Sequence, residues 1–309
     1  MPTDPQAAAR GGQALDPAIL DRLSGLDFVA RTVVEGFMAG QHRSPHRGSS
    51  VEFAQHREYV AGDDLRHLDW KIFARSDRLV VKEFIEESNL VCHLLLDGSE
   101  SMSFGSLGWT KFDYARWAAA ALAHLVIRQR DSAGIVIFDE KERAKVPPGS
   151  GAHQRASIIQ VLEEAEPSGP TQVGEVLSWL ATRLSRRGIV AVFSDFFDEP
   201  DAVIEGLRRL VHGGHEPILF QVLDPQELEF DYDRFLRLEG LEDLGRVKVD
   251  PKAIRAAYRE EIQAHRELLK HHARSLSIDF VALSTATGLD VALSAYLARR
   301  KARARGGGM

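Results

Sequence analysis

The sequence predicts an α/β fold with a mostly parallel sheet that carries helices on both faces. Continuous apolar segments, typical of strands buried on both sides, recur at 90–96, 133–138, 189–194 and 217–223. Segments with helical apolar spacing lie between or beside them, at 111–129, 153–165, 172–186 and 200–211. Apolar strands that alternate with amphipathic helices are the repeating unit of a parallel sheet.

A different pattern precedes this region. Residues 1–15 are rich in Ala, Gly and Pro, and we expect them to be disordered. Residues 16–88 are expected to form a small α+β module. Its helix begins at Asp16-Pro17 and stops near Gly40, strands lie within 50–60 and 78–87, and a short helix lies within 61–75.

The predicted α/β domain extends over residues 89–300. Near its end, Asp250-Pro251 begins a long helix, residues 277–284 are a further strand, and residues 291–300 are a closing helix. The basic residues that follow predict a solvated, flexible tail over 301–309.

Composition restricts the classes of protein. The net charge of -6 argues against a general nucleic-acid binder, which needs a basic face. No window approaches the ~18 uninterrupted apolar residues of a membrane helix, and residues 1–15 lack the apolar stretch of a signal peptide. The single cysteine, Cys92, lies in an apolar run and is expected to be a reduced core thiol. We therefore expect a soluble, cytoplasmic protein without membrane insertion.

Oxygen-bearing side chains follow the first predicted strand of the α/β domain. In HLLLDGSESM (93–102), Asp97 ends the strand and Ser99 and Ser101 alternate after it. Parallel sheets place ligand sites at the carboxyl ends of their strands. Asp195 falls at the end of another predicted strand, and Thr171 falls at the start of a predicted helix. Hard oxygen donors with few carboxylates favour Mg²⁺ or Mn²⁺. The alternative is a capped turn, since Asp and Ser both favour helix starts.

Other polar residues have simpler interpretations. Asp224 follows a predicted strand, but we interpret it as a turn residue before Pro225. Asp69 lies on the apolar stripe of its predicted helix. A buried carboxylate needs a partner, so we expect an ion pair with Arg57, Arg66 or Arg75, and a catalytic role is the alternative.

The five residues Asp97, Ser99, Ser101, Thr171 and Asp195 resemble the metal-ion-dependent adhesion site of the von Willebrand factor A domain. That family has D-x-S-x-S after its first strand, a threonine on a following loop and an aspartate after its fourth strand. The resemblance implies a von Willebrand A-like, Rossmann-like fold. It also implies that the hydroxyls bind the metal directly, that the aspartates bind directly or through water, and that one position stays open for a partner's carboxylate.

The stretch 40–84, from GQHRSPHRGSS to LVVKEF, resembles the hallmark segment of the bacterial domain-of-unknown-function family 58. Members of that family pair this segment with a von Willebrand A-like domain and are typically encoded beside MoxR-type AAA+ ATPases. The resemblance implies such an ATPase as the partner.

These observations lead to three hypotheses for the function of the protein. The first is a non-enzymatic, metal-dependent protein-binding module that works with a MoxR-type ATPase in assembly or maturation of a client protein. It is favoured because the sequence has no H-E-x-x-H, no G-x-S-x-G and no G-x-x-x-x-G-K-[ST] motif. The second is a metal-dependent phosphoester hydrolase, which would need a further carboxylate-rich metal site or a positioned base. The third is a structural scaffold with a vestigial site.

Overall fold

The computed structural model describes residues 16–23, 25–41, 56–58, 73, 75–76, 78–82, 90–233, 236–239 and 246–306. The chain divides into two compact units, residues 1–43 with 89–309, and residues 44–88. In the smaller unit, β1 (His56–Glu58) pairs with β2 (Val80–Lys82) in antiparallel register. Asp69 lies outside the described residues, so its ion pair stays a prediction.

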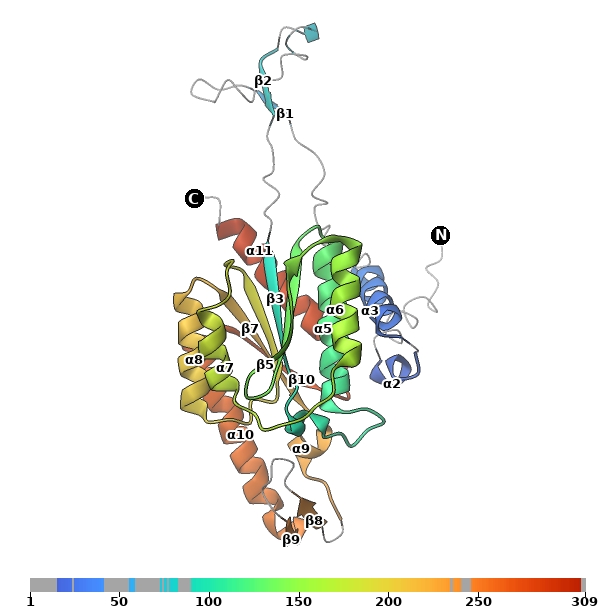
Figure 1. The fold of residues 1–309 in the computed structure, drawn as a ribbon, viewed down its shortest axis with the longest axis vertical. Coiled ribbons are helices and arrows are strands. Elements are labelled where there is room, and N and C mark those ends of the chain that lie inside the picture. The colour runs from blue at the N-terminus through green and yellow to red at the C-terminus, as the bar shows by residue number, and fades with distance from the viewer. Residues whose placement is uncertain are drawn as a thin grey trace. The chain divides into compact units, whose positions relative to one another are not determined.

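The larger unit is built on a six-stranded sheet with the order β10-β7-β6-β3-β4-β5 (Figure 1). Its parallel strands are β3 (Val91–Asp97), β4 (Ser132–Phe138), β6 (Ile189–Ser194), β7 (Glu216–Leu223) and β10 (Asp279–Ser284). All five were predicted to within two residues at each end. The α/β fold with a mostly parallel sheet is therefore confirmed.

The sixth strand, β5 (Glu142–Gly149), was not predicted. It pairs antiparallel with β4 at the edge of the sheet, and partly buried and exposed side chains alternate along most of it. The strand contains Pro147 and Pro148, which an edge tolerates because only one side of the strand needs ladder hydrogen bonds. Its charged, proline-containing sequence lacks the continuous apolar pattern by which the other strands are identified.

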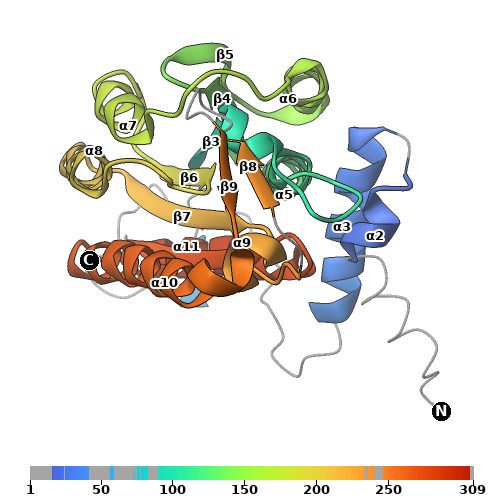
Figure 2. The same ribbon diagram turned by 90° about the horizontal axis from the view of Figure 1, so that it is seen from below.

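Helices cover both faces of the sheet (Figure 2). On one face lie α5 (Lys111–Arg128), α6 (Gly151–Glu164) and α11 (Asp290–Gly306), and on the other lie α7 (Val173–Ala181), α8 (Pro200–His212) and α10 (Pro251–Ser275). The alternation of β3 separates two apolar cores, because Leu94 and Leu96 pack on the α5 side and Leu95 on the α7 side. Both faces are therefore buried, which explains the uninterrupted apolar strands.

The N-terminal helix differs from its prediction in two ways. It is split into α2 (Pro17–Leu20), which Asp16 caps, and α3 (Leu26–Gln41), with Gly25 at φ +87° between them. In addition, α3 packs on α5 and belongs to the larger unit rather than with residues 44–88. Its buried apolar face, which includes Val29, Val33 and Phe37, joins the α5 core, so the division of the chain differs from the expected module 16–88.

The end of the chain is more ordered than expected. After α9 (Pro225–Glu229), β8 (Leu236–Glu239) pairs with β9 (Arg246–Val249) before α10 begins at the cap Asp250. The closing helix α11 continues to Gly306, so residues 301–306 are helical rather than part of a flexible tail. Among the described residues, no helix combines the length and apolar character that crossing a membrane requires.

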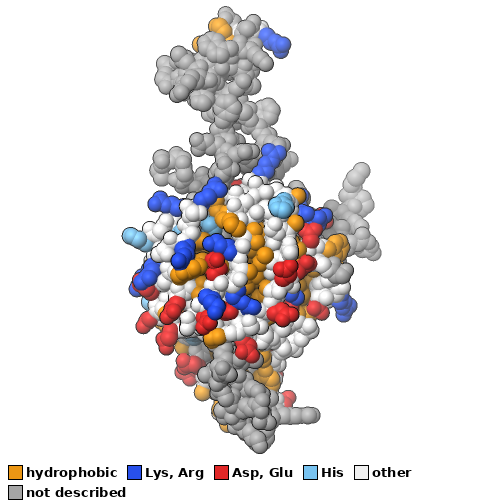
Figure 3. Space-filling model, viewed as in Figure 1, with side chains coloured by type: hydrophobic (Ala, Val, Ile, Leu, Met, Phe, Trp, Pro, Cys, Tyr) orange, Lys and Arg blue, Asp and Glu red, His pale blue; other side chains and the backbone are white. Residues whose placement is uncertain are grey.

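On the face shown in Figure 3, surface charge does not single out a binding region. Basic and acidic side chains lie interspersed over the described part of the face in Figure 3. The charged groups with the most unusual environment are instead buried, at the carboxyl ends of β3 and β6.

Candidate functional site

The loop after β3 holds the first residues of the predicted set. Asp97 ends the strand with no exposed surface, and its Oδ1 accepts a hydrogen bond of 2.9 Å from the backbone N–H of Ser99. A short 3₁₀ turn, Glu100–Ser103, then brings the Oγ of Ser101 to 3.1 Å from the Oγ of Ser99. The alternating spacing thus turns the oxygens of all three residues toward one region.

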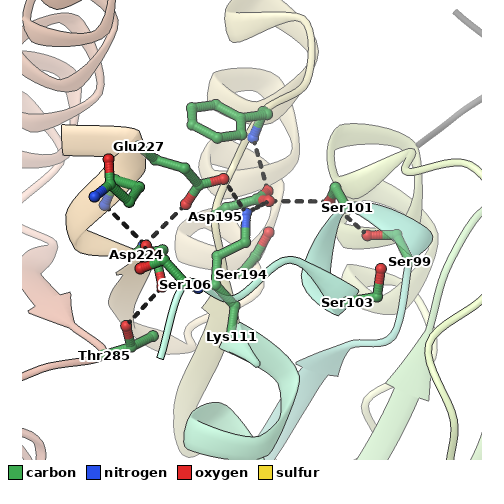
Figure 4. A network of polar contacts seen from close by, with 12 residues as sticks. Ser99, Ser101, Ser103, Ser106, Lys111, Ser194, Asp195, Asp224, Glu227 and Thr285 are labelled. Atoms are coloured by element: carbon green, nitrogen blue, oxygen red, sulfur yellow. Dashed lines mark hydrogen bonds and ion pairs between the residues drawn. The ribbon is translucent and has the colours of Figure 1, made fainter. Parts of the chain in front are cut away.

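Two other segments complete the set. The Oγ of Ser101 donates a 2.9 Å hydrogen bond to Oδ2 of Asp195, which directly follows β6 (Figure 4). Thr171 precedes α7, and its Oγ1 lies 3.4 Å from Oδ2 of Asp97, a long contact. The structure therefore gathers Asp97, Ser99, Ser101, Thr171 and Asp195 at the carboxyl edge of the sheet.

Backbone hydrogen bonds hold the loop of Thr171 in place. The N–H of Glu100 donates to the carbonyl of Gly169 at 2.8 Å, and the N–H of Ser168 donates to the carbonyl of Gly98 at 2.8 Å. Gly169 has φ +78°, in the left-handed region that favours glycine. This reciprocal pairing fixes the threonine loop against the D-x-S-x-S loop.

Ser194 is a contact that the sequence prediction missed. It ends β6, and its Oγ donates a 2.6 Å hydrogen bond to Oδ2 of Asp97 while accepting one of 2.9 Å from the N–H of Phe196. The pairing of Leu96 with Phe193 places Ser194 next to Asp97 in the sheet. The sequence feature that could have identified Ser194 is its position immediately before Asp195.

Lys111, the first residue of α5, was also missed. Its side chain is 1% exposed, and Nζ lies 2.7 Å from Oδ2 of Asp195 and 2.6 Å from Oε1 of Glu227. The ring centroid of Phe197 lies 5.2 Å from the same nitrogen. A buried ammonium thus bridges the predicted set to α9 (Figure 4).

Asp224 makes more contacts than we expected of a turn residue. It is fully buried and caps α9, where its backbone N–H donates to Oε2 of Glu227 at 2.9 Å. Its carboxylate accepts hydrogen bonds from the N–H and Oγ of Ser106 and, at 3.3 Å, from Oγ1 of Thr285. Asp224 therefore joins the loop before α5 to the end of β10, which the turn chemistry of Asp-Pro alone does not indicate.

Burial and neighbouring charges together shift the pKa values of this cluster. Burial and, second, the carboxylate of Asp195 raise the pKa of Asp97 to about 7, against the opposing hydrogen bonds from Ser194 and Ser99. Burial also raises the pKa of Glu227, which the charge of Lys111 offsets only in part. For Lys111, burial opposes the charged form, but the two carboxylates outweigh it and raise the pKa above its ordinary value. The ammonium is thus held charged.

The donor set fits a hard divalent cation. Four carboxyl groups, on Asp97, Asp195, Asp224 and Glu227, share this edge with one ammonium, on Lys111. Burial and, second, the carboxylate of Asp195 disfavour the charged form of Asp97, and a bound Mg²⁺ or Mn²⁺ would favour it. In the described part of the chain, no three His, Cys, Asp or Glu side chains gather as a metal-ligand group. The candidate site thus depends on hydroxyl donors.

Comparison with solved structures identifies the class of fold. The fold is similar to that of a conserved hypothetical protein, BatB, from Bacteroides thetaiotaomicron, with a TM-score of 0.50 at 14% identity over 70% of this chain and 99% of that chain. At this identity the similarity establishes an α/β fold and nothing about activity.

The family is identified by sequence. Residues 55–268 match the model of the family described as "Protein of unknown function DUF58", and the chain belongs to this family. Uncharacterized proteins of Mycobacterium bovis and Mycobacterium tuberculosis are similar to it, each 27% identical over 282 residues, which is 89% of this chain and 87% of theirs. The predicted membership of this family is therefore confirmed.

Proposed function

We propose that this protein is a non-enzymatic, metal-dependent protein-binding module with a von Willebrand A-like site. The observation that carries the proposal is the meeting of Asp97, Ser99, Ser101, Thr171 and Asp195 from separate segments at one edge of a parallel sheet. These residues would hold Mg²⁺ or Mn²⁺. The bound metal would supply an electrophilic position for a carboxylate of the partner protein.

Binding is favoured over hydrolysis because the site lacks a free base in its described surroundings. Activation of water needs a positioned base and further stabilisation of charge. Glu227 is engaged by Lys111 and by the N–H of Asp224. His265 reaches the same edge, but its Nε2 lies 2.9 Å from the carbonyl oxygen of Phe196. We therefore expect no phosphatase, nuclease or peptidase activity.

The partner in this proposal is a MoxR-type AAA+ ATPase of the cytoplasm, with which the protein assembles or matures a client. This part of the proposal comes from the family resemblance of residues 40–84. An acidic side chain on the ATPase or on the client would complete the metal site.

Metal binding tests the site itself. Calorimetric titration with Mg²⁺ or Mn²⁺ should detect binding to the wild type and none to Asp97→Asn or Thr171→Ala. Thr182→Ala is the matched control, because Oγ1 of Thr182 donates only within its own turn, to the carbonyl of Trp179 at 2.8 Å. Unchanged affinity in both site variants would remove these residues from the proposal.

Partner binding and turnover test the function. The purified protein should retain a MoxR-type ATPase from the same bacterium in Mg²⁺ and release it in EDTA, and Thr171→Ala should fail to retain it. Metal-dependent hydrolysis of a generic phosphoester that is lost in Asp97→Asn would instead establish the hydrolase.

A further inference from the structure

Lys111 stands in an unfavourable place for a cation. It is the first residue of α5, where the helix macrodipole presents its positive end, and it is excluded from water. The helix start does not require it, since Thr110 and Asp113 form a complete capping box. A lysine at this position therefore needs a reason beyond the formation of α5.

Both oxygens of the Asp195 carboxylate accept hydrogen bonds from this protein's own groups. Its Oδ2 contacts both Nζ of Lys111, at 2.7 Å, and Oγ of Ser101, at 2.9 Å. Its Oδ1 accepts a hydrogen bond of 3.1 Å from the N–H of Phe197. A metal that binds Oδ2 of Asp195, directly or through water, would compete with the ammonium for that oxygen.

A second carboxylate, that of Glu227, already pairs with the ammonium of Lys111. Glu227 Oε1 lies 2.6 Å from Nζ of Lys111, on the side away from Ser99 and Ser101 (Figure 4). Glu227 is held in turn by the N–H of Asp224, whose carboxylate contacts Ser106. Lys111 can thus lose Asp195 and keep one partly buried partner.

We propose that Lys111 is an internal counter-ion that competes with the metal for Asp195. When the metal binds, Lys111 loses its ion pair with Asp195 and keeps its ion pair with Glu227. This inference rests on the proposed function, and it adds that the chain weakens its own metal site. Lys111 is a positioning residue here, since it acts through Asp195. Metal occupancy is coupled to α9 because Glu227 belongs to that helix.

The test compares Mg²⁺ and Mn²⁺ affinity in the wild type, in Lys111→Met and in the control Arg116→Met. Arg116 lies on the same helix and forms a partly exposed ion pair with Asp113. Removal of a competing charge at this range should tighten metal binding about tenfold or more in Lys111→Met. The same variant should melt at a lower temperature in EDTA and regain stability on addition of metal, whereas Arg116→Met should behave as the wild type.

This combination separates competition from a merely structural role, which would lower stability without raising affinity. Glu227→Gln provides a second background in case Lys111→Met alone does not fold. Glu227→Gln should weaken metal binding, because Lys111 then has Asp195 as its remaining carboxylate, and adding Lys111→Met should tighten it again.

The outcomes distinguish the two proposals. Metal affinity that is equal or weaker after Lys111→Met in both backgrounds overturns the counter-ion and leaves the metal site standing. Absence of binding to the wild type and to every variant overturns both. Binding that emerges only when Lys111 is replaced supports the counter-ion and contradicts the metal binding that we expect of the wild type.

Discussion

The two ends of β3 bury titratable groups in opposite ways. At the amino end, burial lowers the pKa of His93, assisted by the charges of Lys145 and Arg186 and opposed by a hydrogen bond to the carbonyl of Arg186. Burial likewise raises the pKa of the Cys92 thiol. Both groups are therefore held neutral.

At the carboxyl end, charge is retained and compensated. Asp195 keeps the ammonium of Lys111 within 2.7 Å, and the same nitrogen contacts Glu227. Replacing even a well-paired buried ion pair with apolar residues is often neutral or stabilising, so the stability of the fold alone does not account for these charges. This difference between the two ends of β3 favours the binding role that we propose for the carboxyl end.

The largest effect should come from Asp195→Ala. In EDTA, the loss should be about 3 kcal/mol of the free energy of unfolding, because Lys111 would lose one of its two carboxylates while remaining buried. Chemical denaturation measures this loss. The exposed carboxylate of Asp201 is the control, since Asp201→Ala should cost within ~0.5 kcal/mol. A comparably small loss for Asp195→Ala would contradict the buried ion pair between Asp195 and Lys111.

A smaller effect is expected from His93→Gln at the amino end. The Nε2 of His93 lies 2.9 Å from the carbonyl oxygen of Arg186, a neutral hydrogen bond worth about 1 kcal/mol. Because the folded-state pKa is lowered, the unfolded chain takes up the proton first as pH falls through ~6.5, and the contribution of His93 declines. The stability difference between wild type and His93→Gln should therefore shrink from pH 8 to pH 5. A difference that grows on acidification would show that His93 is charged in the fold.

The smallest effect concerns Cys92, which is free and buried, as the sequence predicted. Its raised pKa and lack of access should prevent reaction with a thiol-specific reagent at pH 8 in the folded protein. The urea-unfolded protein, which should release one equivalent, serves as the control. Rapid labelling of the folded protein would show that the amino end of β3 opens to solvent.

Much of the fold and of the candidate site could be predicted because the signals are local. Strands buried on both faces are continuous apolar runs, and a run that stops at Asp97 or Asp195 marks the carboxyl edge of the sheet. The edge strand β5 escaped prediction because alternate residues face solvent. The helix α3 was assigned to the wrong neighbours because an apolar face does not specify its partner.

By itself, therefore, the sequence determined the α/β class, the order of most elements and the five oxygen-bearing residues that meet at one edge. Only the tertiary structure decided which groups compensate them. Lys111 is 84 residues from Asp195 and 116 residues from Glu227 along the chain, and no local pattern links such distant residues. Their pairing arises because the β3–α5 connection, the end of β6 and the start of α9 converge at the same edge. There, low exposure to water makes every charge depend on its nearest partner.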